Sequence, residues 1–355
     1  EQPVWAGIAL AAALGQIGLP GGGFGHGHGS MGDIGSARPQ YPLPRFGQGS
    51  NPVSAFIPVA RVADMLLAPG EPFEYDGGHY EYPDIRLVYW AGGNPFHHHQ
   101  DLHRLREAFR RPDTLIVHEP FWTPMARHAD IVFPATLTIE RDDLGAGHRD
   151  THLIAMHRAV EPYGDARDDY EILSGLATRL GFAAEFTDGR TANEWIELIY
   201  DEWRTTSGVA APPFEQFWAD GGVELPGADE QTTSFSRFRS DPDGAPLPTP
   251  SGRIELFSST VAGFGYDDCP GHPAWLGSGA GDADDTSFVL VSNQPTTRLH
   301  SQLDPGDTSV AGKIDGREPM RIHPDDAAAR GIADGDVVRL YNERGACLAG
   351  AVISD

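Results

Sequence analysis

Residues 87–96 read LVYWAGGNPF, an apolar run that passes at once into two glycines, an asparagine and a proline. A run of this length that ends in Gly and Pro is typical of a buried strand entering a turn. Further apolar runs follow at 114–118 (TLIVH) and 129–134 (ADIVFP), with helical patterns at 59–67 and 101–110. Short apolar strands that alternate with helices predict a doubly wound, largely parallel α/β sheet.

The rest of the sequence divides by composition into a predicted three-domain arrangement. Residues 1–182 form the α/β domain and include expected helices over 3–15 and 169–180. Residues 183–284 form an irregular α+β connecting region, with a helix over 192–203 and its clearest strand at 253–257. Residues 285–355 alternate short strands, such as 288–291 and 337–341, with Gly and Asp turns, which predicts a truncated C-terminal β-barrel.

Charge and cysteine content exclude several classes of protein. The 355 residues carry 26 Lys and Arg against 51 Asp and Glu, a formal net charge of −25. Nucleic-acid binding needs clustered basic residues, so no nucleic-acid partner is expected. No apolar run approaches the roughly 18 residues of a membrane helix. Two cysteines without a CxxC pair predict no zinc or iron–sulfur site built on thiolates.

Both ends of the sequence have the character of cut ends. The chain begins at Glu1 inside a helical pattern and stops at Asp355 inside a strand-like run. No basic, signal-like segment precedes the first helix. We therefore expect an internal fragment of a longer protein.

Polar groups follow the first two predicted strands of the sheet. The first strand leads into GGNPFHHHQ at 92–100, and His118 and Glu119 close the second. Ligands of open α/β sheets bind beyond the carboxyl ends of strands, where glycines allow close approach and helix starts offer N–H groups. The alternatives are a tight turn with solvent-facing histidines and, for Glu119, a surface carboxylate. Adjacent histidines point in different directions, so a metal site is not expected there.

A third polar segment follows the strand expected at 288–291. Its side chains can bond phosphate oxygens or heterocycle edges, and a simple polar loop is the competing interpretation. The members are Ser292, Asn293, Gln294, Arg298, His300, Ser301 and Gln302. The adjacent residues Glu140 and Arg141 are ambiguous, because they suit either a surface ion pair or a buried anion clamp.

Taken together, these segments resemble the molybdopterin oxidoreductases, in the group of dimethyl sulfoxide, trimethylamine N-oxide and biotin sulfoxide reductases. Within that group the motifs resemble those of dimethyl sulfoxide reductases. The order and spacing of the shared motifs hold along nearly the whole chain. The motifs are GQIGLPGGGFG at 15–25, YWAGGNPF at 89–96, HHQD at 98–101, WTP at 122–124, ARHADIV at 126–132, ER at 140–141, RLHSQ at 298–302 and HPDDAAARGI at 323–332.

The resemblance implies a molybdenum ion held by two molybdopterin guanine dinucleotides, with no iron–sulfur cluster in this chain. On this basis the guanine nucleotide would be held by Asn94, His98, His118, Glu119, Arg141 and Asp169. The pterin and pyrophosphate side would be held by Ser292, Gln294, Arg298, His300, Ser301 and Gln302. The family usually has Asp at the position of Glu119. Its serine ligand to molybdenum lies in sequence absent here, so no catalytic residue or metal ligand is assigned.

The resemblance also implies an activity, which is reduction of S- or N-oxides such as dimethyl sulfoxide and trimethylamine N-oxide by oxygen-atom transfer. An electron donor such as a cytochrome or another reductase component would be the partner. The implied setting is anaerobic respiration in the periplasm, with the cytoplasm as the alternative. Two other functions stay open: a biotin or methionine sulfoxide reductase, and a truncated, non-catalytic cofactor-binding remnant. The fragment alone is expected to be inactive.

Overall fold

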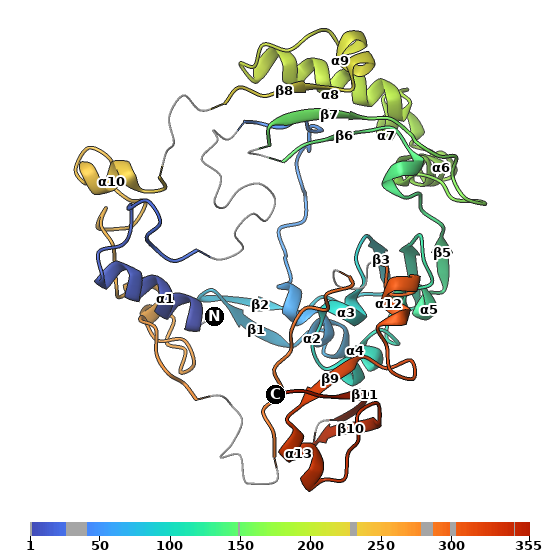
Figure 1. Cartoon of the computed structure of the whole chain (residues 1–355). Coiled ribbons are helices and arrows are strands. Elements are labelled where there is room, and N and C mark those ends of the chain that lie inside the picture. Colours follow the sequence, from blue (N-terminus) through green and yellow to red (C-terminus); the bar gives the residue numbers. More distant parts are fainter. Residues whose placement is uncertain are drawn as a thin grey trace. The chain divides into compact units, whose positions relative to one another are not determined.

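The computed structural model describes residues 2–25, 41–147, 150–227, 233–277, 287–298, 303–343 and 345–355. Figure 1 shows the ribbon coloured along the sequence, and the chain divides into two compact units, each assembled from separate stretches of sequence. Unit 1 consists of Glu1–Phe56, Pro72–Tyr80 and Pro134–Asp282, and unit 2 consists of Ile57–Glu71, Glu81–Phe133 and Ala283–Asp355. The predicted domains, by contrast, are contiguous stretches of sequence, and they stay a prediction.

A parallel sheet lies at the centre of unit 2. Its strands are β3 (Leu87–Ala91), β4 (Thr114–His118) and β5 (Ile131–Phe133), in that order. Ala91 pairs with His118, and His118 pairs with Phe133, so the three carboxyl ends meet at one edge. The strands expected from the apolar runs are therefore confirmed, as is a parallel α/β arrangement.

Short helices follow these strands, and each begins at a capping side chain. They are α3 (Pro95–His98), α4 (Leu102–Ala108) and α5 (Pro124–His128), whose caps are Asn94, Asp101 and Thr123. Each cap accepts a hydrogen bond from a backbone N–H of the first turn, which would otherwise lack a partner. With η2 (Val59–Arg61) and α2 (Val62–Leu67), these helices confirm the patterns at 59–67 and 101–110.

The core of this sheet region is made by residues from the strands and the helices together. Leu105 of α4, Val117 of β4 and Met125 of α5 are fully buried. Complete burial of an aliphatic side chain contributes about 1.5–3 kcal/mol. This packing fixes α4 and α5 against the sheet, and it thereby sets the position of the loops at the carboxyl edge.

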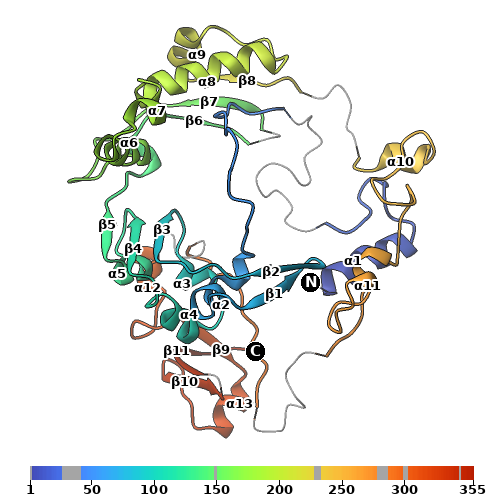
Figure 2. The same ribbon diagram turned by 180° about the vertical axis from the view of Figure 1, so that it is seen from behind.

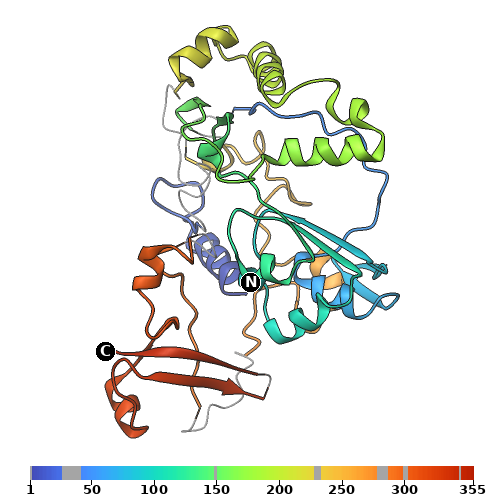
Figure 3. The ribbon, with the colours of Figure 1, turned by 90° about the vertical axis from the view of Figure 1, so that its right-hand side faces the viewer.

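A second sheet of unit 2 is formed near the C-terminus and is drawn in red in Figure 3. It contains β9 (Pro319–Ile322), β10 (Val337–Asn342) and β11 (Gly345–Ile353), in the order β10-β11-β9. β11 runs antiparallel to β10 and parallel to β9. The strand expected at 337–341 is confirmed, and the β-barrel stays a prediction. Two short helices, α12 (Asp307–Ala311) and α13 (Pro324–Ala329), belong to the same stretch.

One strand expected in this stretch, at 288–291, is wrong. Phe288 to Val291 form no strand in the described chain, and their side chains are 55–80% exposed. An apolar, β-branched run has the local preference of a strand, but a strand exists only where a neighbour completes its hydrogen bonds.

Unit 1 has an antiparallel sheet covered by helices. The strands β6 (Asp143–Gly145), β7 (His152–Met156) and β8 (Gly222–Glu224) lie in that order. The helices are α6 (Asp169–Leu180), α7 (Ala183–Thr187), α8 (Ala192–Thr206) and α9 (Phe214–Asp220), and Figure 2 shows α8 and α9 beside the sheet. Tyr200 and Phe217 are fully buried and stack at 4.2 Å. The helices expected at 169–180 and 192–203 are confirmed.

The remaining elements of the described chain are short. They are α1 (Gln2–Ala13), the hairpin of β1 (Pro72–Tyr75) and β2 (Gly78–Glu81), η3 (Thr138–Glu140), α10 (Ser236–Ser240) and α11 (Ser259–Gly263). Helix α1 confirms the first expected helix.

The strand expected at 253–257 is wrong. Arg253 donates from its backbone N–H to Ser251 and accepts from Thr249 at its carbonyl, so turn contacts replace a ladder. No described helix is long and apolar enough to cross a membrane.

Candidate functional site

The carboxyl edge of the β3-β4-β5 sheet gathers four of the predicted cofactor-binding residues. Asn94 and His98 follow β3 through the Gly92-Gly93 turn and α3. His118 ends β4, and Glu119 is the next residue. Because Ala91 pairs with His118, the loops that follow β3 and β4 begin side by side. The sequence pattern alone had placed these residues beyond strand ends, and the structure brings them to one edge.

Asn94 has an unsatisfied donor at this edge. The residue is 1% exposed, and its Oδ1 accepts from the N–H of Phe96 at 3.2 Å to cap α3. Its Nδ2 is buried and has no hydrogen-bond partner among the described residues. More than nine in ten buried polar groups are paired in native proteins, and an unpaired one costs about 1–3 kcal/mol. The amide therefore fits an acceptor supplied by a ligand.

The backbone before Asn94 leaves room for such a ligand. Gly92 and Gly93 have φ angles of +82° and +76°, in the left-handed region that favours glycine. A Cβ built on either residue would meet no heavy atom within 4 Å. The backbone conformation therefore requires glycine at both positions, and both positions border open space.

His118 is held inside the sheet edge. It is 4% exposed, and its Nε2 lies 2.6 Å from the hydroxyl oxygen of Tyr89 on the neighbouring strand. Its ring also packs edge-on against Phe133 of β5. Contacts to both neighbouring strands fix the orientation of the imidazole. His98, at the end of α3, is exposed.

Glu119 is a half-buried carboxylate that folds back over its own turn. Oε2 accepts from the hydroxyl of Thr123 at 2.9 Å, and Oε1 accepts from the N–H of Phe121 at 3.4 Å. Burial raises the pKa of Glu119, and these two hydrogen bonds act in the opposite direction. The expectation of a surface carboxylate is therefore wrong, and Glu119 also supports Thr123, the cap of α5.

We expect Glu119→Gln to stabilise the protein more at neutral than at acidic pH. Since burial raises the pKa of the folded carboxyl above its ordinary value of 4.5, the folded state binds the proton more tightly than the unfolded chain. The stability contributed by protonated Glu119 is full below that ordinary value and is lost as the pH rises through the raised pKa. Urea unfolding of the cofactor-free protein at acidic and neutral pH measures the difference. An equal effect at both pH values, or an equal pH trend for the exposed Glu197→Gln, would contradict the expectation.

Arg141 and Asp169 lie in unit 1. Arg141 pairs with Asp143, with Nη2 3.1 Å from Oδ2, rather than with Glu140. Asp169 is exposed in the first turn of α6, and its neighbour Asp168 caps that helix. Nothing in their local surroundings assigns either residue to a ligand, so both stay predictions.

Glu140 is buried and does not form a surface ion pair. The residue is 7% exposed, and its carboxylate accepts from the backbone N–H of Leu137 at 2.7 Å and of Tyr163 at 2.9 Å. The surface ion pair with Arg141 is therefore wrong, and the anion clamp stays a hypothesis. Glu140 instead joins two segments of unit 1 through backbone hydrogen bonds.

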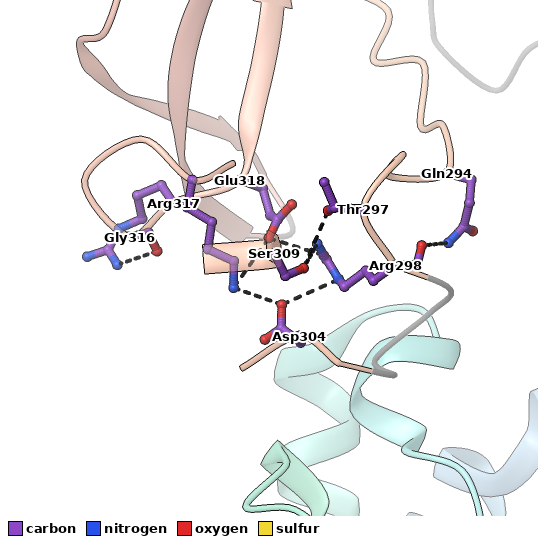
Figure 4. Close-up of polar contacts among 9 residues, drawn as sticks. Gln294, Thr297, Arg298, Asp304, Ser309, Gly316, Arg317 and Glu318 are labelled. Carbon is purple, nitrogen blue, oxygen red and sulfur yellow. Dashed lines mark hydrogen bonds and ion pairs between the residues drawn. The ribbon is translucent and has the colours of Figure 1, made fainter. Parts of the chain in front are cut away.

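The late polar segment is described in part. Ser292 and Gln294 are exposed, and Gln294 donates from Nε2 to the carbonyl of Arg298 at 3.2 Å. The guanidinium of Arg298 is largely buried and contacts Asp304, Ser309 and Glu318 (Figure 4). His300, Ser301 and Gln302 lie outside the described residues. Sequence reasoning missed the residues around Arg298, because pairing between distant charges leaves no local pattern.

Comparison with known proteins identifies the family. Residues 1–179, half of the chain, match the family described as molybdopterin oxidoreductase. The chain belongs to the molybdopterin oxidoreductases. Residues 288–355 match the molybdopterin dinucleotide binding domain, which supports the molybdopterin dinucleotide part of the cofactor that the resemblance implied. The unpaired Nδ2 of Asn94 and the open space beside Gly92 and Gly93 fit an acceptor-rich dinucleotide.

Relatives of this molybdopterin oxidoreductase include several named reductases. Biotin sulfoxide reductase of Cereibacter sphaeroides is 50% identical over the whole chain, which covers 48% of that protein. Dimethyl sulfoxide/trimethylamine N-oxide reductase of Rhodobacter capsulatus is 42% identical over the whole chain, which covers 45% of it. Trimethylamine-N-oxide reductase of Haemophilus influenzae is 44% identical, with 46% covered. The chain spans about half the length of the curated relatives it matches.

Proposed function

We propose that the whole protein reduces S- or N-oxides by oxygen-atom transfer and that this chain supplies part of the pocket for two molybdopterin guanine dinucleotides. The names of the relatives support the reaction class. The buried, unpaired amide of Asn94 at the carboxyl edge of the sheet carries the assignment of the nucleotide site. When bound, the molybdenum cofactor supplies the oxygen-transfer chemistry, and this chain holds the cofactor and excludes water.

In this proposal the guanine nucleotide is held mainly at the β3-β4-β5 edge. The Nδ2 of Asn94 donates to the nucleotide. The Glu119 carboxylate accepts from it while sharing Oε2 with Thr123, and His118 fixes the floor of the site through its contact with Tyr89. His98 of α3 completes this edge, and Arg141 and Asp169 of unit 1 stay ligands implied by the resemblance. The pterin side is held by Ser292, Gln294, His300, Ser301 and Gln302.

We further propose the finer architecture expected from the sequence. The parallel sheet would be part of a doubly wound α/β domain over 1–182, followed by a connecting region over 183–284. The β10-β11-β9 sheet would be part of a β-barrel domain over 285–355. Three parallel strands with capped helices after them, and a mixed three-stranded sheet near the C-terminus, support this assignment.

One observation favours a particular substrate class within the group. Identity to the biotin sulfoxide reductase is 50%, against 42% and 44% for the dimethyl sulfoxide/trimethylamine N-oxide and trimethylamine-N-oxide reductases. Biotin sulfoxide is therefore the second candidate substrate. An electron donor such as a cytochrome belongs with a periplasmic enzyme, and a cytoplasmic reductant belongs with a sulfoxide repair enzyme.

The proposal is tested on the whole protein, expressed in a host that makes the cofactor. We expect one molybdenum and two acid-released GMP molecules per protein. Oxidation of reduced viologen by dimethyl sulfoxide, trimethylamine N-oxide and biotin sulfoxide then ranks the substrates. A folded protein that carries neither molybdenum nor GMP would overturn the proposal. The same assay on protein from a host unable to make the cofactor is the control.

A further inference from the structure

Arg298 lies at the centre of a charged network in unit 2. Its side chain is 9% exposed, and its Nε lies 3.3 Å from Oδ1 of Asp304. Its Nη2 lies 3.1 Å from Oε1 of Glu318, and its Nη1 lies 3.4 Å from the hydroxyl of Ser309 (Figure 4). All three of its nitrogen atoms thus contact polar groups of this same chain.

Lys313 completes this network. It is the sole lysine of the sequence and is 17% exposed. Its Nζ lies 2.7 Å from Oδ1 of Asp304 and 3.7 Å from Oε1 of Glu318. Two cations therefore share two carboxylates. Since the four formal charges cancel, the network as a whole has little attraction for an anion such as pyrophosphate.

The network joins parts of the chain that flank the segment 299–302. Arg298 directly precedes this segment and Asp304 follows it closely, so their ion pair connects its two ends. Ser309 lies in α12 and is 2% exposed. Glu318 directly precedes β9, and its carbonyl accepts from the N–H of Gly350 in β11. Arg298 and Asp304, the described residues on either side, are thereby attached to the C-terminal sheet.

The same network lies near the first strand-end segment. His97 of α3 is close enough for the charges of Asp304, Arg298 and Lys313 to act on it. Partial burial lowers the pKa of His97, and the charge of Asp304 opposes that shift. The network is thus adjacent to both of the candidate segments in unit 2.

We propose that Arg298, Asp304, Lys313 and Glu318 form a positioning network that fixes the two ends of the segment 299–302. Arg298 acts in this network and is not a ligand of the pyrophosphate. The inference rests on the proposed function, because the proposed function assigns the segment 299–302 to the binding of a molybdopterin dinucleotide. It replaces the role that the sequence predicted for Arg298.

The variant Asp304→Asn separates the two roles of Arg298, because they predict opposite signs. If Arg298 bound pyrophosphate directly, removing a neighbouring negative charge would leave cofactor retention unchanged or increase it. If Arg298 is a positioning residue, losing its charged partner loosens the segment. We then expect the dinucleotide, measured as acid-released GMP, to leave the whole protein on the order of tenfold faster, as for loss of a charged hydrogen bond. Slower or unchanged loss of GMP would overturn the proposal.

A second measurement does not depend on the cofactor. In cofactor-free whole protein, Asp304→Asn and Arg298→Gln should each raise amide hydrogen exchange in the peptide 296–305 on the order of tenfold. The double variant should add little to either one, because both remove the same contact. Glu318→Gln should act in the same direction. Unchanged exchange in these variants would also overturn the proposal.

The control is Asp315→Asn, which makes the same chemical change at an exposed position on the other side of α12. Asp315 has a φ of +47°, which asparagine tolerates well. We expect it to alter neither GMP retention nor exchange in 296–305. A whole protein that never carries GMP would contradict the proposed function, and the exchange experiment would still test the network.

Discussion

Asn94→Ser is expected to raise the rate at which the whole protein loses its guanine nucleotide on the order of tenfold. Serine retains a side-chain oxygen that caps α3, so the helix start is preserved. It removes Nδ2, the buried donor that has no partner among the described residues. The loss of one buried hydrogen bond to the ligand, about 1–3 kcal/mol, sets the size of the effect. Retained GMP after gel filtration, followed over time, gives the rate.

The same variant should have the opposite effect without the cofactor. Removing an unpaired buried donor removes its desolvation cost, so the cofactor-free protein should be as stable as the parent or more stable. Asn193→Ser, which removes an exposed amide that donates to Asp142, is the control for the chemical change. Equal GMP retention in Asn94→Ser and the parent would show that the amide does not face the nucleotide.

Glu140→Ala is expected to reduce the free energy of unfolding by about 3 kcal/mol. The carboxylate accepts from two backbone N–H groups, of Leu137 and Tyr163, and the substitution leaves both without their acceptor. A hydrogen bond to a charged group contributes about 1.5–3 kcal/mol, and water can replace part of it because Leu137 and Tyr163 are exposed. Urea unfolding of the whole protein, followed by a probe in unit 1, measures the change.

Two further variants define the cause of this loss. Glu140→Gln keeps one carbonyl oxygen that can accept from one of the two N–H groups, so it should lose less than Glu140→Ala. Glu197→Ala changes an exposed glutamate of α8 and should shift the free energy by no more than about 0.5 kcal/mol. An equal loss of unfolding free energy in Glu140→Ala and Glu197→Ala would show that the backbone hydrogen bonds of Glu140 do not stabilise the protein.

The parallel sheet and its helices could be predicted from sequence because their signals are local. The runs at 87–91 and 114–118 match β3 and β4, and the helical pattern at 169–180 matches α6. Five or more consecutive residues are enough for an apolar run or a helical period to be legible. The position of Asn94 and Glu119 beyond strand ends follows from the same patterns.

The parts that escaped prediction depend on contacts between distant residues. Two strands of the unit 1 sheet, β6 and β8, were missed because they have three residues each, too few to show a period of two. The runs at 253–257 and 288–291 have strand-like composition without a partner strand. The Glu140 contacts and the Arg298 network join residues whose spacing carries no motif, so only the folded chain reveals them.

The divided sequence of unit 2 constrains when the cofactor can enter the protein. Its stretches Glu81–Phe133 and Ala283–Asp355 are separated by all of Pro134–Asp282. Translation proceeds from the N-terminus, so the β3-β4-β5 edge leaves the ribosome long before Arg298 and β9 exist. On the proposed assignment, a dinucleotide that needs both stretches finds no complete site on the nascent chain. On this assignment, insertion of the cofactor follows synthesis of the C-terminal sheet. The complete but unfilled protein then has to persist as a folded intermediate until the cofactor is inserted.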